Sequence, residues 1–112
     1  MFQLFDVVTV SVTFNEDRTQ SKIRPAIVLQ VDGELVQLIW ATTQSVCDSG
    51  AKPWEFCITD PAEMRQMGHT KPARYDFRRG GVIVVRKSEV LEMIGKCPKS
   101  VQTRLVRAAR NA

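Results

Sequence analysis

The chain has 112 residues, enough for a single domain over 1–112 with a hydrophobic core of its own, without metal or disulfide support. A formal net charge of +4 mildly favours a polyanionic partner. No apolar run reaches the ~20 residues of a membrane-spanning helix, the amino terminus lacks the basic start of a signal peptide, and three cysteines without a CxxC spacing predict free thiols in a reducing cytoplasm.

The first part of the chain reads as strands. Alternating apolar residues over 5–14 predict a long, half-buried strand. The polar stretch 15–22 is typical of a solvent loop that is long enough to reach over a neighbouring site. Apolar runs at 26–31 and 35–43 flank the link Asp32-Gly33, which predicts an antiparallel hairpin.

The rest of the chain mixes short strands with helices. The patterns predict strands at 54–59, 73–77 and 82–85, and helices at 61–67, 89–94 and 99–110. Asp60 as a cap and Gly68 as an exit frame the first helix. The unbroken apolar run at 82–85 predicts either burial on both faces of that strand or a position in a barrel interior. Many short strands with a carboxy-terminal helix indicate a compact barrel, whose closure would protect the sheet edges.

Arg24 stands directly before Pro25, which favours extended backbone at the start of the second strand. A lone buried guanidinium is costly, so Arg24 either pairs with a carboxylate or faces a polar cleft. The hairpin places it near Thr42 and Thr43, which begin the hydroxyl and amide cluster 42–45. A structural ion pair for Arg24 and a plain polar strand end for 42–45 are the competing interpretations.

Five segments, spread along almost the whole chain, resemble motifs of the PemK/MazF-like toxins of bacterial toxin–antitoxin modules. The order and spacing of the five segments indicate this family more specifically than any single segment does. They are Asp6-Val7-Val8, the Arg-Pro-apolar block Lys22–Leu29, the strand-end run Ala41–Ser45, Gly68 with Lys71-Pro72, and Ile94-Gly95-Lys96.

The resemblance implies a mainly β (α+β) fold, a small SH3-like β-barrel with short helices and a carboxy-terminal helix. It also implies an endoribonuclease that cuts single-stranded RNA without a metal or another cofactor. Such proteins are usually homodimers, and a cognate antitoxin protein blocks their site.

Cleavage by the RNA's own 2′-hydroxyl needs charge stabilisation and proton transfer from the protein. Arg24 is suited to binding the phosphate, since its donors form a fixed fork, and a guanidinium, which stays protonated, is a poor base. Thr42 or Thr43 would bind the phosphate or orient the 2′-hydroxyl. His69 is the only imidazole and would titrate near neutrality, although a lone loop histidine is more often incidental.

The candidate RNA-binding residues are cations, polar side chains and one aromatic ring: Arg18, Lys22, Gln44, Ser45, Trp54, Lys71 and Arg74. Core packing is the competing interpretation for Trp54. The last helix, with Arg104, Arg107 and Arg110, could also touch RNA, and a solvated face is the competing interpretation for these arginines. Gly68-His69-Thr70 stands where some relatives have an Arg-x-Asp pair, which leaves the proton donor and acceptor unassigned. One histidine and scattered cysteines give no metal-ligand spacing.

Two other functions fit the same residues. One is a growth-inhibiting toxin of the same barrel class that binds a protein target, as the gyrase-poisoning relatives do. The other is a catalytically inactive barrel that retains binding to RNA or to an antitoxin. An Arg24 buried in a carboxylate pair would favour the inactive barrel, whereas an Arg24 facing a hydroxyl cluster favours the nuclease.

Overall fold

The computed structural model describes residues 2–14, 17–42, 51–78 and 80–112, and only the backbone of 12–14 and 17–21. Seven strands and two α-helices follow in chain order, with one 3₁₀ turn. They are β1 (Asp6–Phe14), β2 (Asp17–Asp32), β3 (Leu35–Thr42), β4 (Glu55–Ile58), α1 (Pro61–Met67), β5 (Ala73–Asp76), β6 (Val82–Arg86), the 3₁₀ turn η1 (Lys87–Glu89), β7 (Val90–Lys96) and α2 (Lys99–Arg110).

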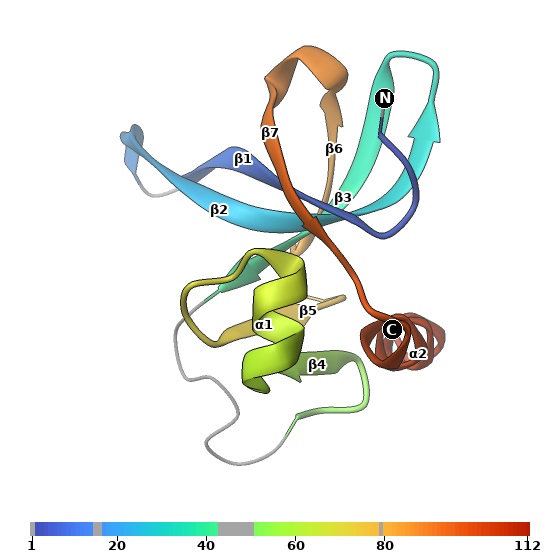
Figure 1. Cartoon of the computed structure of the whole chain (residues 1–112). Coiled ribbons are helices and arrows are strands. Elements are labelled where there is room, and N and C mark those ends of the chain that lie inside the picture. The colour runs from blue at the N-terminus through green and yellow to red at the C-terminus, as the bar shows by residue number, and fades with distance from the viewer. Residues whose placement is uncertain (1, 15–16, 43–50, 79) are drawn as a thin grey trace.

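All strands pair antiparallel, in the order β4-β5-β3-β2-β1-β7, with β6 on β3. Strand β3 changes partner along its length, because residues 35–39 pair with β6 and Ala41 and Thr42 pair with β5. The sheet curls strongly, but among the described residues its pairing path does not close (Figure 1). The mainly β (α+β) fold with a carboxy-terminal helix is confirmed, with a curled sheet whose pairing leaves it open.

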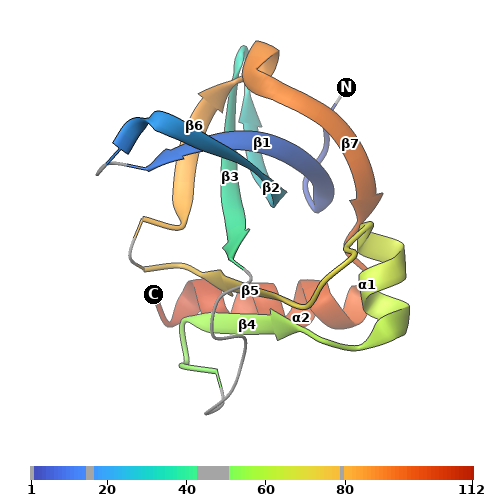
Figure 2. The same ribbon diagram turned by 90° about the vertical axis from the view of Figure 1, so that its left-hand side faces the viewer.

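Two apolar clusters lie on opposite faces of the central strands. The cluster inside the curl contains Val8, Val10, Ala26, Val28, Val36 and Leu38. The other cluster joins Val7, Ile27, Ile39 and Ala41 to β4, β5 and both helices. Figure 2 shows the corresponding arrangement, with β4, β5 and α2 stacked below the curled strands. Burial on both faces explains why three consecutive residues of β2, 26–28, are all fully buried.

The predicted hairpin between the second and third strands is confirmed, with Asp32 opposite Leu35. The predicted solvent loop at 15–22 is wrong for the described residues 17–22, which extend β2. There the backbone pairs with β1 as far as Asp17 opposite Phe14. Polarity misled the prediction, because a hairpin arm that leaves the core keeps its backbone pairing while its side chains need not be apolar.

One prediction about 82–96 is wrong. The expected helix at 89–94 is instead β7, which covers the edge of β1 with two register shifts. Pairing with an open edge satisfies a row of backbone groups, and this outweighs the weak local helix signal. Strand β6 lies where expected. Val84 is 59% exposed, so the strand is not buried on both faces, but Ile83 and Val85 pack against the cluster inside the curl, which agrees with the alternative of a barrel interior.

The two α-helices begin and end where the sequence predicts. Asp60 Oδ2 accepts a hydrogen bond from the Glu63 amide at 3.0 Å, and Gly68 ends α1 in the left-handed region at φ 71°. Helix α2 buries Val101, Leu105 and Ala108, whereas Ala109 is exposed. No helix in the described part of the chain has the length and apolarity needed to cross a membrane.

The cysteines differ from the expectation of three free thiols. Cys97 is free and buried, and burial raises its pKa to about 12. Cys57 is disulfide-bonded, so the prediction is wrong for this residue. Cys47 lies outside the described residues.

Candidate functional site

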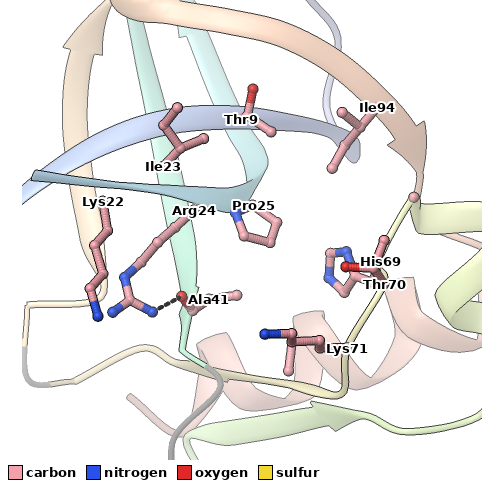
Figure 3. Close-up of a pocket in the computed structure, with 12 residues that line it drawn as sticks. Thr9, Lys22, Ile23, Arg24, Pro25, Ala41, His69, Thr70, Lys71 and Ile94 are labelled. Atoms are coloured by element: carbon pink, nitrogen blue, oxygen red, sulfur yellow. Dashed lines mark hydrogen bonds between the residues drawn. The ribbon is translucent and has the colours of Figure 1, made fainter.

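A pocket of about 460 Å³ lies between β2 and the loop that joins α1 to β5. Lys22, Arg24 and Pro25 approach it from β2, and His69, Thr70 and Lys71 from the loop opposite (Figure 3). The remaining lining residues are Thr9, Ile23, Ala41, Gly68, Ala73 and Ile94. We call this the Arg24 pocket.

Pro25 marks the place where the pocket opens. The β2–β3 ladder ends at Ala26 opposite Trp40, and the next residue of β3, Ala41, pairs instead with Tyr75 of β5. Proline has no amide hydrogen for a ladder and suits a strand position that lacks a neighbour. Because β3 leaves β2 at this point, residues 22–25 of β2 have no strand neighbour on that side among the described residues, and their side chains line the pocket.

Arg24 lies at the rim of this space and is partly buried. Its Nη1 donates a hydrogen bond to the Ala41 carbonyl oxygen at 3.4 Å. Its guanidinium carbon lies 5.3 Å from the centroid of the Trp40 ring. These contacts hold the charged group by a carbonyl and an aromatic face beside the pocket, and a guanidinium at such a place suits the fork-like contacts that a phosphate accepts.

Two glycines determine the position of the loop that forms the opposite wall of the pocket. A side chain at Gly68 would collide with the Ile94 carbonyl oxygen, and one at Gly95 would collide with the Gln66 carbonyl oxygen. The end of α1 and strand β7 thus touch backbone to backbone, which only glycine allows. This contact fixes the start of the loop that presents His69, Thr70 and Lys71 to the pocket.

His69 is only 8% exposed and stacks near Tyr75, whose hydroxyl lies 2.8 Å from His69 Nε2. Its Nδ1 is buried without a hydrogen-bond partner among the described residues. Burial lowers the pKa of His69 from 6.5 to about 4. The expected titration near neutrality is therefore wrong, and the imidazole is neutral at pH 7.

The Arg24 pocket is cationic. Lys22 and Lys71 are exposed, and with Arg24 they bring three positive charges to the lining. None of the described lining residues is acidic. Apolar side chains, chiefly Ile23, Pro25 and Ile94, form the rest of the wall together with two threonines. Such a pocket suits an anion attached to a less polar group.

The structure brings together Arg24, Lys22, Lys71 and His69, four residues that the sequence singled out. Thr42 ends β3 opposite Arg74 and does not line the pocket. Thr43, Gln44 and Ser45 lie outside the described residues, as does the side chain of Arg18. Thr42 is therefore the only member of the expected cluster 42–45 that the structure describes.

Two further candidates lie away from the Arg24 pocket. Arg74 Nε is 3.2 Å from Glu55 Oε2 in an ion pair that lacks hydrogen-bond geometry. Trp54 is partly buried, and the Arg78 guanidinium covers its ring at 3.9 Å from the centroid. Arg74 and Arg78 thus each have a partner within the fold. Neither Arg74 nor Trp54 lines the pocket.

Arg104 of α2 also has a structural role. Its Nη1 and Nη2 donate to the two carboxylate oxygens of Glu63 at 3.0 and 2.7 Å, and Nη2 also donates to the Cys57 carbonyl oxygen. The hydrogen bond from Arg104 is the main cause that lowers the pKa of Glu63. This two-pronged pair ties α1 to α2, so Arg104 belongs to the helix junction and not to a solvated basic face.

Sequence reasoning missed Thr9 and Ile94 as lining residues. Thr9 lies opposite Pro25 in the β1–β2 ladder, which the alternating pattern of 5–14 could have suggested. Ile94 was assigned to a helix, and only the pairing of β7 with β1 brings it here. Among the described residues, no group of three or more His, Cys, Asp and Glu side chains could hold a metal ion.

No protein-family model matches the sequence, and no curated protein matches it either. Among solved structures, the Mycobacterium tuberculosis toxin MazF-mt6 is similar to this chain, with a TM-score of 0.65. The likeness covers 93% of this chain and 93% of that one at 15% sequence identity. At that identity the likeness establishes the arrangement of the backbone, and it agrees with the motifs found in the sequence. The chain has a MazF/PemK-like fold.

Proposed function

We propose that the protein is an endoribonuclease toxin of a type II toxin–antitoxin module, and that it cuts single-stranded RNA in the Arg24 pocket without a metal. The observation that supports this most is the convergence of Arg24, Lys22 and Lys71 on one pocket whose described lining has no acidic residue. A phosphodiester is the anion that RNA offers to such a lining.

In this proposal the RNA supplies the nucleophile. Its 2′-oxygen attacks the adjacent phosphorus, the bond to the 5′-oxygen of the next nucleotide breaks, and a 2′,3′-cyclic phosphate forms. The proton leaves the 2′-hydroxyl, and one proton returns to the departing 5′-oxygen. Negative charge grows on the non-bridging phosphate oxygens, where the Arg24 guanidinium would stabilise it by charge-assisted hydrogen bonds.

The other lining residues take supporting parts. Lys22 and Lys71, exposed on opposite sides of the pocket, would bind the phosphates that flank the cut. The apolar wall of Ile23, Pro25 and Ile94 would contact a sugar or a base. His69, neutral and hydrogen-bonded to Tyr75, shapes the floor of the pocket and is not assigned as a general acid.

The proposal includes a cytoplasmic homodimer that is inhibited by a cognate antitoxin protein. The fold shared with a toxin named MazF-mt6 supports this assignment. An inhibitor that fills the Arg24 pocket would need anionic side chains to complement its lining.

The test uses the purified chain and a long single-stranded RNA in excess EDTA. The proposal predicts discrete cuts and upstream fragments that end in a 2′,3′-cyclic phosphate. RNA that stays intact in EDTA would overturn it. A parallel supercoiling assay with DNA gyrase identifies the protein-targeting alternative, which predicts intact RNA and inhibited supercoiling.

A further inference from the structure

Trp40 of β3 directly precedes Ala41, which lines the Arg24 pocket, but Trp40 itself does not line it. The sequence indicates no function for Trp40, because an aromatic residue in a buried strand is expected to pack in the hydrophobic core. Its position opposite Ala26, on the same face of the sheet as Arg24, puts its ring beside the arginine side chain. It is partly buried, so one face of the indole remains for the guanidinium.

Hydrogen bonds to the turn before β6 also hold Trp40 in place. Trp40 Nε1 donates to the Gly80 carbonyl oxygen at 2.9 Å, and the Trp40 amide donates to the Gly81 carbonyl oxygen, also at 2.9 Å. Two hydrogen bonds to consecutive carbonyls fix both the backbone and the indole plane. A ring fixed in this way offers a constant surface to the group that rests on it.

The Arg24 guanidinium carbon is 5.3 Å from the Trp40 ring centroid, within the range of an attractive cation–π contact. Its Nη1 meanwhile donates to the carbonyl of Ala41, the residue after Trp40 (Figure 3). Two consecutive residues of β3 thus contact one guanidinium, Trp40 with its ring and Ala41 with its carbonyl oxygen. Both contacts limit the rotamers that the Arg24 side chain can adopt.

We propose that Trp40 is a positioning residue: together with the Gly80–Gly81 carbonyls, it holds the Arg24 guanidinium at the mouth of the pocket in the orientation that receives an anionic ligand. The part that concerns RNA rests on the proposed function, whereas the contact itself does not. Trp40 acts through Arg24 and makes no contact with the substrate.

The contact is tested first without RNA. The chain has two tryptophans, so Trp54→Phe leaves Trp40 as the only indole. A positive charge over the ring perturbs its emission, and Arg24→Ala in this background is expected to shift the emission maximum of the folded protein. An unchanged emission spectrum would overturn the proposal, whatever the protein does to RNA.

The second measurement is a double-mutant cycle on the affinity for a 2′-O-methylated single-stranded RNA, which cannot be cleaved. Trp40→Leu is expected to weaken binding by roughly 3- to 30-fold when Arg24 is present and to have no effect in an Arg24→Ala background. Trp40→Phe, which keeps an aromatic face but loses the bond to Gly80, is expected to recover part of the affinity. Trp54→Phe is the matched control, since it also lies under an arginine but outside the pocket.

The outcomes separate the two proposals. Equal losses on Trp40→Leu with and without Arg24 would mean a general structural role and would overturn the positioning proposal. An emission shift on Arg24→Ala, together with an unmodified RNA that is neither bound nor cut, would support the contact and overturn the nuclease. Thermal unfolding of each variant confirms that the comparison is made between folded proteins.

Discussion

Two arginines show how differently this chain uses the same side chain. Arg104 meets the Glu63 carboxylate through two hydrogen bonds at 3.0 and 2.7 Å, and it joins α1 to α2. Arg24 is held by a carbonyl oxygen and an indole face at the rim of a pocket whose described lining has no acidic residue. Arg104 therefore belongs to the helix junction, whereas Arg24 lines a cationic pocket that suits an external anion.

The largest expected effect is on Arg24. Arg24→Ala should lower RNA cleavage by ~100- to 1,000-fold, because it removes the charge that stabilises the transition state. Arg24→Lys keeps a charge but loses the fork, and an intermediate rate is expected. Cleavage is measured under single-turnover conditions. Arg110→Ala, on the exposed side of α2, is the control and should cut at the wild-type rate. Equal losses in both variants would contradict the distinction between the two regions.

His69 gives the next effect, on stability. Its pKa is about 4 in the folded chain and near 6.5 when unfolded, so the unfolded chain binds more protons between these values. Stability from this group is therefore complete above pH 6.5 and is lost as the pH falls toward 4. The loss amounts to up to about 3 kcal/mol. Denaturant unfolding from pH 7 to about 5 should show this slope in the wild type but not in His69→Phe. The same slope in both proteins would contradict the buried, neutral imidazole.

At the helix junction, Arg104→Met should lower the free energy of unfolding by ~1–3 kcal/mol, because it leaves the Glu63 carboxylate without its charged donor. The pair lowers the pKa of Glu63 below 4.5, so its contribution is present above that pH and is lost as the pH falls through the lowered value. Arg107→Met, the same change at an exposed position of α2, should alter stability by no more than about 0.5 kcal/mol. A similar small change in both would show that the pair contributes little.

The smallest expected effect is on salt dependence. Each phosphate contact on a single strand adds about 0.7 to the slope of log affinity against log salt concentration. Lys71→Ala should reduce that slope by about this amount, whereas Arg110→Ala should leave it unchanged. Filter binding of a non-cleavable RNA at several salt concentrations measures both slopes. A reduced slope for Arg110→Ala would extend the RNA-binding surface to α2.

Local signals predicted the elements whose ends are set locally. Asp60 and Gly68 framed α1, and the Asp32-Gly33 link indicated the β2–β3 hairpin and hence the proximity of Arg24 to the end of β3. Residues 17–22 and 90–96 were misassigned, because each is a strand only by virtue of its pairing with β1. A pairing between distant segments leaves little trace in either segment alone.

The same distinction applies to the pocket. Arg24, Lys22, Lys71 and His69 were found because charge and motif single them out. The neutral state of His69 was not foreseen, since it follows from burial against Tyr75. Trp40 gave no signal, because its role arises only when the Gly80–Gly81 turn and β2 meet on either side of its ring.

Backbone amide chemical shifts would show directly whether RNA binds in the Arg24 pocket. A non-cleavable single-stranded RNA would be titrated into the isotope-labelled protein. The account predicts that the largest shift changes fall on residues 22–24 and 68–71, on the two sides of the pocket, and that they disappear in Arg24→Ala. Shift changes concentrated on α2, or unchanged by Arg24→Ala, would contradict it.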